Sequence, residues 1–334
     1  MVLAVFGLYA RYGGRFTRES AAGPIGTGMF LGMLAFAFVW LAELPFGLAG
    51  LWWERRHHLS KQGYLDVVVN SFVSLGSQFI FVSIAIGVVM ALARPLRNLW
   101  WVAAVPVLVA LAFAYAFVAP YAIPDVHALR SAKVAADARA IARVEGVSDV
   151  PAKVQDVHKQ TTAPNAEAVG IGPSRRIILW DTLLDGRFDR VQVRSVIAHE
   201  YAHIKRDHIL KGVGWFGLLL LPAAIVIALV TKGRGGMSRP ESVPLALFAV
   251  IALSFLTLPL QNLVSRHVEA EADWLSLQTT RDPAAMRGAQ RELSIASLAE
   301  PDPPGWAHAL FDTHPATIQR IAMAQAWEER TGGR

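Results

Sequence analysis

Long apolar stretches alternate with polar segments along this chain, and their lengths predict helices that cross a membrane. A helix rises about 1.5 Å per residue, so about 20 mostly apolar residues cover the roughly 30 Å hydrocarbon core of a bilayer. The first apolar residues, Met1–Ala10, are short for a crossing and lack the charged start and cleavage site of a signal peptide, so a sixth crossing stays open. The five predicted spans are Thr27–Gly50, Ser71–Leu92, Leu99–Tyr121, Gly212–Thr231 and Val243–Val264.

Two polar segments interrupt this pattern: Ala122–Lys211 follows the third span, and Ser265–Arg334 follows the fifth. Because two crossings separate them, both segments emerge on the same side of the membrane and can build one domain. We therefore expect a mainly α-helical membrane protein, a multi-span bundle that carries a domain with a small β-sheet. The expected organisation is a three-span region at 1–121, domain parts at 122–211 and 265–334, and a two-span hairpin at 212–264.

The composition agrees with a membrane protein, because 54% of the residues are hydrophobic, 17% are charged and the mean hydropathy is +0.37. The net charge of +6 comes from basic residues near the span ends, with no basic face interleaved with aromatic residues, so no nucleic-acid partner is expected. Basic residues flank the spans almost equally on both sides, which leaves the orientation open. The chain has no cysteine, which excludes disulfides and thiolate chemistry.

The polar segment 122–211 has elements of its own. His127–Arg143 has the periodicity of an amphipathic helix that ends at Gly146. Short β-rich runs separated by Pro and Gly turns follow it and predict a small sheet. An edge of such a sheet beside the next helix would let a peptide substrate bind as an added strand. The predicted strands are Lys153–Lys159, Ala166–Ile171 and Arg176–Trp180.

The candidate chemistry lies in Ser195–Ile209, SVIAHEYAHIKRDHI, which contains the pattern HExxH. His199 and His203 are four residues apart and share one helix face, so both imidazoles can bind one metal ion. Glu200 can then take a proton from a water on that metal. No Pro or Gly intervenes before Gly212, so this helix is expected to run directly into the fourth span. HExxH alone occurs by chance on the order of once per hundred chains of this length, and solvated histidines on a charged helix are the alternative.

A third ligand is needed, and the sequence excludes one class of site. Arg206 and Ile209 stand where a metzincin requires Gly and His. A gluzincin-type site needs a Glu on a later helix, usually with an Asp four residues on, and SRHVEAEAD supplies Glu269 and Asp273. Glu269 would complete three ligands with the fourth position open, and Asp273 would accept a hydrogen bond from a ligand histidine. Glu271 points to another face and is a poor ligand.

Polar residues inside the predicted spans have two interpretations. In the second span four of them recur every fourth residue, which is the spacing of one helix face. They either line a water-filled cavity or make interhelical hydrogen bonds. Glu43 in the first span is costly unless it is paired, faces a cavity or lies near the interface. The residues of the stripe are Asp66, Asn70, Ser74 and Gln78.

Four ordered motifs resemble the integral-membrane zinc endopeptidases of peptidase family M forty-eight. They are NAEAVGIGPSRRIILWDTLL, VIAHEYAHIKRDH, SRHVEAEAD and FDTHPATIQRI, and the resemblance covers roughly Val144–Ala324. The resemblance is strongest to the type 1 CAAX prenyl proteases, of the sterile-twenty-four type, and next to the HtpX-type bacterial membrane proteases. It implies one Zn²⁺ per chain held by His199, His203 and Glu269, with Glu200 as the general base.

The resemblance also implies roles for residues outside the helix motif. Asn165, followed by Ala166, matches the asparagine at the strand edge that holds the substrate backbone. His314 and Arg320 match a pair near the active site that stabilises the oxyanion, and His208 matches a histidine common after HExxH in the prenyl proteases.

Two features depart from the family pattern. Glu167 stands where family members usually carry an aromatic residue, and five firm spans are predicted where the prenyl proteases have seven around a large chamber.

We therefore expect a membrane-embedded zinc metalloendopeptidase, similar to the CAAX prenyl proteases, that acts on a peptide or membrane-protein substrate beside the lipid bilayer. One alternative is an HtpX-like protease for the quality control of membrane proteins. The other is a catalytically silent membrane scaffold, although a closed structural site has no use for Glu200. The resemblance places the protein in a bacterial cell membrane with its protease site on the cytoplasmic side.

Overall fold

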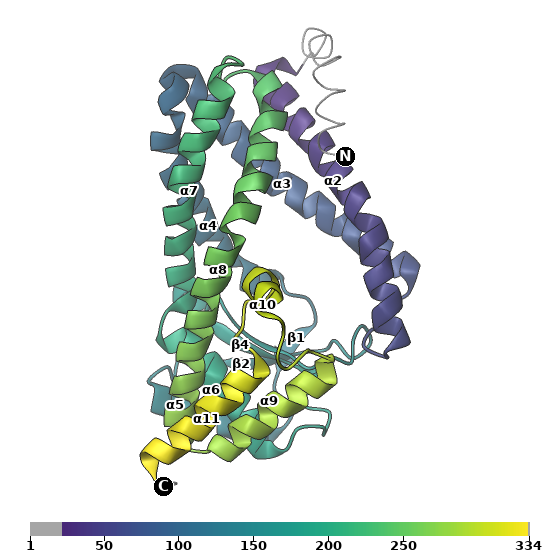
Figure 1. Cartoon of the computed structure of the whole chain (residues 1–334), viewed down its shortest axis with the longest axis vertical. Helices are drawn as coiled ribbons and strands as arrows, with labels where there is room; N and C mark the ends of the chain where they lie inside the picture. Colours follow the sequence, from purple (N-terminus) through teal and green to yellow (C-terminus); the bar gives the residue numbers. More distant parts are fainter. Residues whose placement is uncertain (1–21, 333–334) are drawn as a thin grey trace. The chain divides into compact units, whose positions relative to one another are not determined.

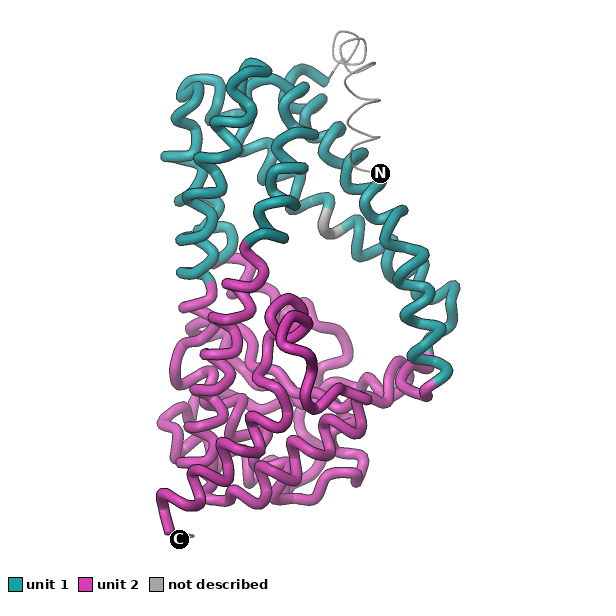
Figure 2. The backbone as a smooth tube through the Cα atoms, viewed as in Figure 1, with its two compact units in different colours: residues 1–56, 62–112, 213–256 teal, residues 57–61, 113–212, 257–334 magenta. Residues whose placement is uncertain are grey.

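The computed structural model of the chain describes residues 22–332, apart from the side chains of Ser77 and Gln78. Figure 2 shows that the chain divides into two compact units. Unit 1 holds the residues up to 56 together with 62–112 and 213–256, and unit 2 holds 57–61, 113–212 and the residues from 257 onward. The predicted stretch Met1–Ala10 lies outside the described residues.

Helices form most of the described chain (Figure 1), and four short strands lie in unit 2. The long apolar helices are α2 (Gly23–Arg56), α3 (Tyr64–Leu96), α4 (Trp100–Ala122), α7 (His208–Lys232) and α8 (Val243–Thr280). The other helices are α5 (Ala132–Glu145), α6 (Arg190–Lys205), α9 (Pro283–Ser297), α10 (Gly305–Phe311) and α11 (Thr317–Thr331). The 3₁₀ turns are η1 (Arg97–Leu99), η2 (Gly172–Ser174), η3 (Asp181–Leu183) and η4 (Pro240–Ser242).

All five predicted spans are helical. Within the described residues, four helical runs are long and apolar enough to cross a membrane, and one of them, Tyr64–Ala122, contains both the second and the third predicted span. Arg97, with a φ of 51°, interrupts this 59-residue run between α3 and α4. At about 1.5 Å per residue, α3 and α4 are roughly 50 and 35 Å long, and each is sufficient for a crossing.

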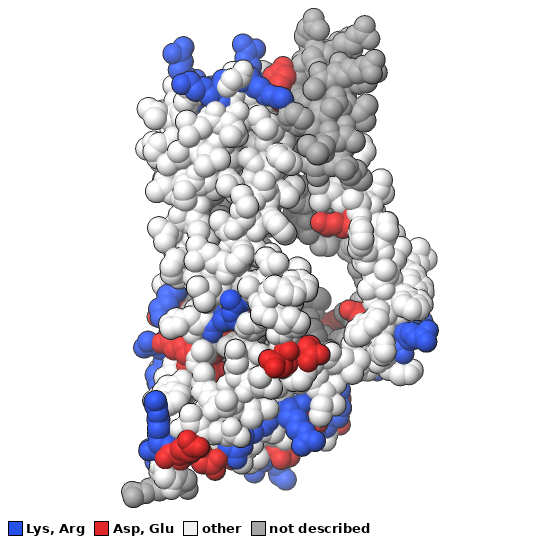
Figure 3. Space-filling view, viewed as in Figure 1, with Lys and Arg blue, Asp and Glu red and all other residues white. Residues whose placement is uncertain are grey.

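Small residues let the helices of unit 1 approach closely. Gly28 and Gly32 lie four residues apart on α2 and face Met90 and Ile86 of α3, and a Cβ added at either glycine would fall within 2.2 Å of those side chains. Small residues at helix contacts are typical of membrane bundles, where packing rather than water exclusion drives association. Figure 3 shows Lys and Arg gathered where α7 connects to α8, with a surface free of charged residues along the rest of those two helices in unit 1.

The polar residues of the predicted stripe are exposed on α3 where the structure describes them. Asp66, Asn70 and Ser74 are exposed, and Asp66 also accepts the backbone N–H of Gly63 at 3.1 Å, which caps the start of the helix. The side chain of Gln78 is outside the described part of the chain. Glu43 is exposed on α2. Whether the stripe lines a water-filled cavity stays a prediction.

Unit 2 contains a four-stranded sheet in the order β1-β2-β4-β3. The central pair β2–β4 is parallel, and β1 and β3 add antiparallel at the two edges. The structure shortens two predicted strands and converts the start of the predicted helix at His127 into β1. That helix begins instead after Ser131, whose hydroxyl accepts the N–H of Val134, and it ends at Gly146 with a φ of 76°. The strands are β1 (Val126–Ala128), β2 (Ala152–Gln155), β3 (Ala166–Val169) and β4 (Arg176–Trp180).

Helix α6 packs against the sheet, α5 and α9 through an apolar face. Val193, Ile197 and Tyr201 belong to a buried cluster that also takes in β4, α5 and α9. The Tyr201 hydroxyl donates to the carbonyl of Val150 at 3.1 Å, so its polar atom is satisfied inside that core. Asp189 caps the first turn of α6 by accepting the N–H of Gln192. The opposite face of α6 therefore carries the polar residues of the motif.

The expectation that the HExxH helix runs unbroken into the fourth span is wrong. Helix α6 ends at Lys205, and Asp207 has a φ of 52°, a left-handed conformation that stops the helix before α7 begins at His208. Asp tolerates this conformation better than most residues, so the helix ends although no Pro or Gly stands there. The fifth span does continue without a break, because α8 carries both the apolar stretch and Glu269.

Candidate metal centre and catalytic cleft

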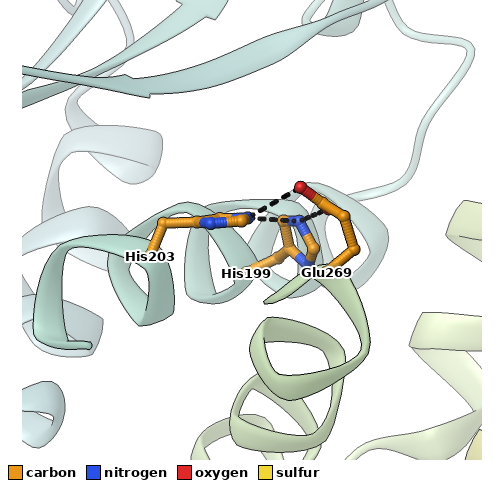
Figure 4. Close-up of side chains that lie close together, drawn as sticks. All are labelled: His199, His203 and Glu269. Atoms are coloured by element: carbon orange, nitrogen blue, oxygen red, sulfur yellow. Dashed lines mark hydrogen bonds and ion pairs between the residues drawn. The ribbon is translucent and has the colours of Figure 1, made fainter. Parts of the chain in front are cut away.

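Three side chains from two helices converge in unit 2 (Figure 4). The Nε2 atoms of His199 and His203 on α6 lie 3.0 Å apart. The Glu269 carboxylate of α8 lies 3.1 Å from the first and 3.6 Å from the second. All three donor atoms fall within 4.8 Å of one another, and Glu269 is buried. The arrangement brings together the two imidazoles and the carboxylate that the sequence singles out.

A carboxylate and a guanidinium stand behind His199. The Asp273 Oδ1 lies 2.9 Å from the Nδ1 of His199, on the side of the ring opposite the Nε2 that faces His203. Arg320 of α11 donates to both oxygens of Asp273, at 2.7 and 2.5 Å. Asp273 is almost fully buried, so this charged pair is shielded from water. Asp273 therefore lies where the spacing of Glu269 and Asp273 predicts it.

A second chain of contacts stands behind His203. The Nδ1 of His208 lies 3.0 Å from the Nδ1 of His203, and the Nε2 of His208 lies 3.1 Å from Glu271. Arg206 in turn contacts Glu271. The left-handed turn at Asp207 permits this arrangement, because it folds His208 back against the end of α6. Glu271 is outside the three-donor cluster, but it has a partner that the sequence did not reveal.

The donors fit a metal cation. Burial disfavours a charged imidazole at His199, yet Asp273 and Glu269 outweigh burial through hydrogen bonding and charge, and they raise its pKa to about 10. The negative charge that favours a proton on His199 also favours a metal cation, which would replace that proton between the three donors. Two imidazole nitrogens and one carboxylate with a fourth position open form the donor set of catalytic zinc sites.

Glu200 and the predicted substrate residues line one cleft of about 90 Å³ beside His199. Glu200 is 7% exposed, and burial raises the pKa of its carboxyl, partly offset by the two neighbouring imidazoles. Asn165 and Ala166 lie at the rim where the edge strand β3 begins. The Asn165 carbonyl accepts the N–H of Trp180, so its backbone belongs to the ladder with β4 while its side chain is exposed.

His314 and Arg320, which the family resemblance pairs, reach the cleft in different ways. The Nε2 of His314 lies 3.2 Å from the Glu269 carboxylate, and its side chain is 55% exposed. The guanidinium of Arg320 is turned toward Asp273, although it also lines the cleft. The structure thus brings both to the centre, with His314 on its open side and Arg320 behind His199.

Glu167 is the residue that stands where the family usually carries an aromatic. It is half-buried on β3, and burial together with the negative charge of Glu200 raises the pKa of its carboxyl. The edge strand therefore carries an acidic residue close enough to the cleft to interact electrostatically with Glu200.

Sequence reasoning missed two residues on α8 next to this centre. Asn262 and Arg266 hydrogen-bond to the backbone of the segment that carries His314. The sequence did contain a signal for them. Asn262, Arg266, Glu269 and Asp273 stand at i, i+4, i+7 and i+11, and positions with this spacing share one helix face.

Comparison with known proteins identifies the group to which these motifs belong. A family model described as Peptidase family M48 matches residues 128–328, more than half of the chain. The Uncharacterized metalloprotease YhfN of Bacillus subtilis (strain 168) is 26% identical over 321 residues, 90% of this chain and 74% of that relative. A Protease HtpX homolog of Methylibium petroleiphilum is 30% identical over 184 residues, 49% of this chain and 65% of that relative.

A solved structure extends the similarity through the membrane helices. The structure titled Crystal Structure of S. mikatae Ste24p matches with a TM-score of 0.75 and covers 88% of this chain and 74% of the other. At 17% identity the likeness concerns the fold alone. The mainly helical membrane fold and the family resemblance predicted from the motifs are both confirmed.

Proposed function

The chain belongs to peptidase family M48 and is an integral membrane metalloprotease, and from this premise we propose that it is a zinc endopeptidase that cuts peptide bonds close to the membrane surface. The convergence of His199, His203 and Glu269 beside Glu200 carries the proposal. Glu269 follows Val264, the last residue of the predicted span, by five residues on the same helix, which is about 8 Å. The site is thus only a turn or two from the hydrocarbon.

The chain's own residues divide the chemistry between them. When bound, a zinc ion supplies Lewis-acid polarisation of the scissile carbonyl and lowers the pKa of water toward about 7. Glu200 takes a proton from the attacking water and delivers it to the leaving amine. His314, on the open side of the cleft, donates to the developing oxyanion. Asp273 orients the His199 ring, and Arg320 holds Asp273 in place.

The substrate backbone binds along β3 in this proposal. As the edge strand of the sheet, β3 pairs with β4 on one side and can accept an extended peptide on the other. Asn165 and Ala166 lie where the strand meets the cleft, so a peptide added there brings a carbonyl to the metal centre. The Asn165 side chain is free to bind the peptide backbone because it is exposed.

Two substrate classes follow from the relatives. The motif resemblance to the CAAX prenyl proteases favours a prenylated carboxyl-terminal peptide, and the fold match to Ste24p is compatible with it. Identity of about 30% to HtpX homologues, confined to roughly half of this chain, favours unfolded membrane proteins instead. The cleavage rates of a prenylated peptide, the same peptide without its lipid, and a misfolded membrane protein distinguish the two.

The resemblance further leads us to infer that the protein lies in a bacterial cell membrane with its centre on the cytoplasmic side. The decisive test of the function uses purified full-length protein in detergent or nanodiscs. Cleavage of a fluorogenic peptide should disappear with a chelator, return with Zn²⁺ and fail to return with Mg²⁺. Cleavage that survives complete removal of metal, or a folded protein that binds no zinc, would exclude the proposal.

A further inference from the structure

One face of α8 connects the metal centre to the segment that carries His314. Asn262, Arg266, Glu269 and Asp273 lie at i, i+4, i+7 and i+11 and therefore form a single polar row along the helix. Glu269 is a member of the donor cluster, and Asp273 contacts His199 of that cluster. Asn262 and Arg266 instead donate hydrogen bonds to a different part of the chain.

That part is the C-terminal end of α10. Asn262 is buried, and its Nδ2 donates to the carbonyls of Ala309 at 3.2 Å and Leu310 at 2.8 Å. Arg266 donates to the carbonyls of His308 at 2.9 Å and Asp312 at 2.8 Å. The last carbonyls of a helix generally have no partners within the helix, so Asn262 satisfies those of Ala309 and Leu310. Arg266 adds a donor to the His308 carbonyl, which also accepts the N–H of Asp312, and binds the Asp312 carbonyl just beyond the helix.

His314 follows this attachment by two residues. Asp312 ends the bonded stretch, and the Nε2 of His314 then lies 3.2 Å from Glu269. The segment 308–314 is therefore held to α8 at two places. Asn262 and Arg266 bind its backbone, and His314 contacts Glu269. The His314 side chain is 55% exposed, and besides Glu269 its ring contacts the hydroxyl of the adjacent Thr313, 3.0 Å from its Nδ1. Thr313 lies on the same short segment, so the backbone attachment at Asp312 helps to determine where both side chains lie.

We propose that Asn262 and Arg266 are positioning residues that act through the backbone of His308–Asp312 to hold His314 over the metal centre. This inference rests on the proposed function and adds two residues to its machinery. In the described part of the chain, neither residue belongs to the three-donor cluster or lines the cleft, so their effect on turnover passes through His314. A role limited to capping α10 would change stability but would not depend on whether His314 is present.

The first experiment measures position without activity. Hydrogen–deuterium exchange of the full-length, zinc-loaded protein is followed in residues 305–316 for Arg266→Ala and Asn262→Ala. We expect exchange about tenfold faster there, with α6 and α8 unchanged, because the carbonyl ends of α10 lose their partners. Gln261→Ala is the matched control, since Gln261 is exposed on α8 and bonds to Thr257 of the same helix. Unchanged exchange in both variants would overturn the proposal, whether or not the protein proves to be a peptidase.

The second experiment is a double-mutant cycle on peptide turnover. Arg266→Ala should lower kcat at least about tenfold with KM and zinc content nearly unchanged, as expected for a displaced catalytic group. In a His314→Ala background the same substitution should cost no further activity, since the group it positions is already absent. Arg266→Lys, which keeps a cationic donor, should recover part of the loss. Losses that multiply in the double variant, or zinc loss in Arg266→Ala, would refute the assignment, while an inactive zinc-loaded wild type would instead refute the proposed function.

Discussion

Arg320 donates to both carboxylate oxygens of Asp273, at 2.7 and 2.5 Å, and so joins the C-terminal helix α11 to the metal-bearing helix α8. Asp273 in turn contacts His199, so the orientation of one donor ring depends on a residue 121 positions later in the chain. His203 is supported differently, through His208 and Glu271. Substitutions can therefore perturb the two imidazoles separately, and the contribution of each support to metal binding can be measured on its own.

Asp273→Asn should lower the zinc affinity about 10- to 100-fold, as loss of a carboxylate behind a ligand histidine does in other metal sites. It also removes the charge that pairs with Arg320 through two hydrogen bonds, and breaking a pair whose carboxylate is 1% exposed costs about 3–5 kcal/mol of unfolding free energy. Competition with a chelator of known affinity, at a temperature where the variant is folded, measures the first effect. Asp302→Asn, an exposed acid in the loop before α10, is the control, and an Asp273 variant with the affinity of that control would contradict the assignment.

His208→Ala should weaken zinc binding about tenfold by releasing the second imidazole, His203. His267→Ala, an exposed histidine on α8 outside the cluster, should have no effect. The same chelator titration compares the two variants. If both bind zinc like the wild type, the contact between His208 and His203 has no role in holding the metal.

Glu200→Gln should keep its zinc but lower peptide turnover at least about a hundredfold, because an amide cannot accept and return the proton. Metal content by mass spectrometry and steady-state cleavage of the same preparation give both results. The substitution removes no metal donor, so a loss of zinc in this variant would indicate a misassigned role for Glu200. Turnover close to that of the wild type would do the same.

Acid should remove the contribution of Asp137 to stability. Arg190 donates to both Asp137 oxygens, at 2.7 and 2.9 Å, and it holds the pKa of that carboxyl below the value of about 3.9 expected in the unfolded chain. A lowered folded-state pKa means that the stabilisation is complete above about pH 4 and disappears as the pH falls through the folded pKa.

Asp137→Asn should accordingly cost roughly 1–2 kcal/mol at pH 7 and much less at pH 2–3. Thermal unfolding of both proteins in detergent at the two pH values gives the difference. Asp185→Asn, an exposed loop acid paired with Arg187, is a suitable control. A difference between Asp137→Asn and wild type that stays constant with pH would show that charge is not the source of the stabilisation.

The orientation can be read directly because the natural chain has no cysteine. A membrane-impermeant maleimide applied to intact cells should label Lys232→Cys, at the end of α7, from outside. Lys133→Cys, exposed on α5 of unit 2, should react only after the cells are permeabilised. The opposite pattern would place the metal centre on the outer face and exclude a cytoplasmic substrate.

Much of the architecture followed from the sequence because its causes are local. An apolar run of about 20 residues has few alternatives to a membrane helix, and all five predicted runs are helical. His199 and His203 share a face by spacing alone, and two intervening spans return Glu269 to the same side. These inferences need only the period of a helix and the thickness of a bilayer.

Other features depended on contacts between distant segments. The left-handed residue Asp207 ends α6 early, and only then can His208 reach His203. Arg320 faces Asp273, and Asn262 and Arg266 hold the α10 segment, although nothing near them in the chain encodes those partners. Side-chain spacing determines which residues share a helix face, but the packing of separate helices decides what that face contacts. The ligands and Asp273 were therefore visible in the sequence, whereas the contacts of His208, Arg320, Asn262 and Arg266 were not.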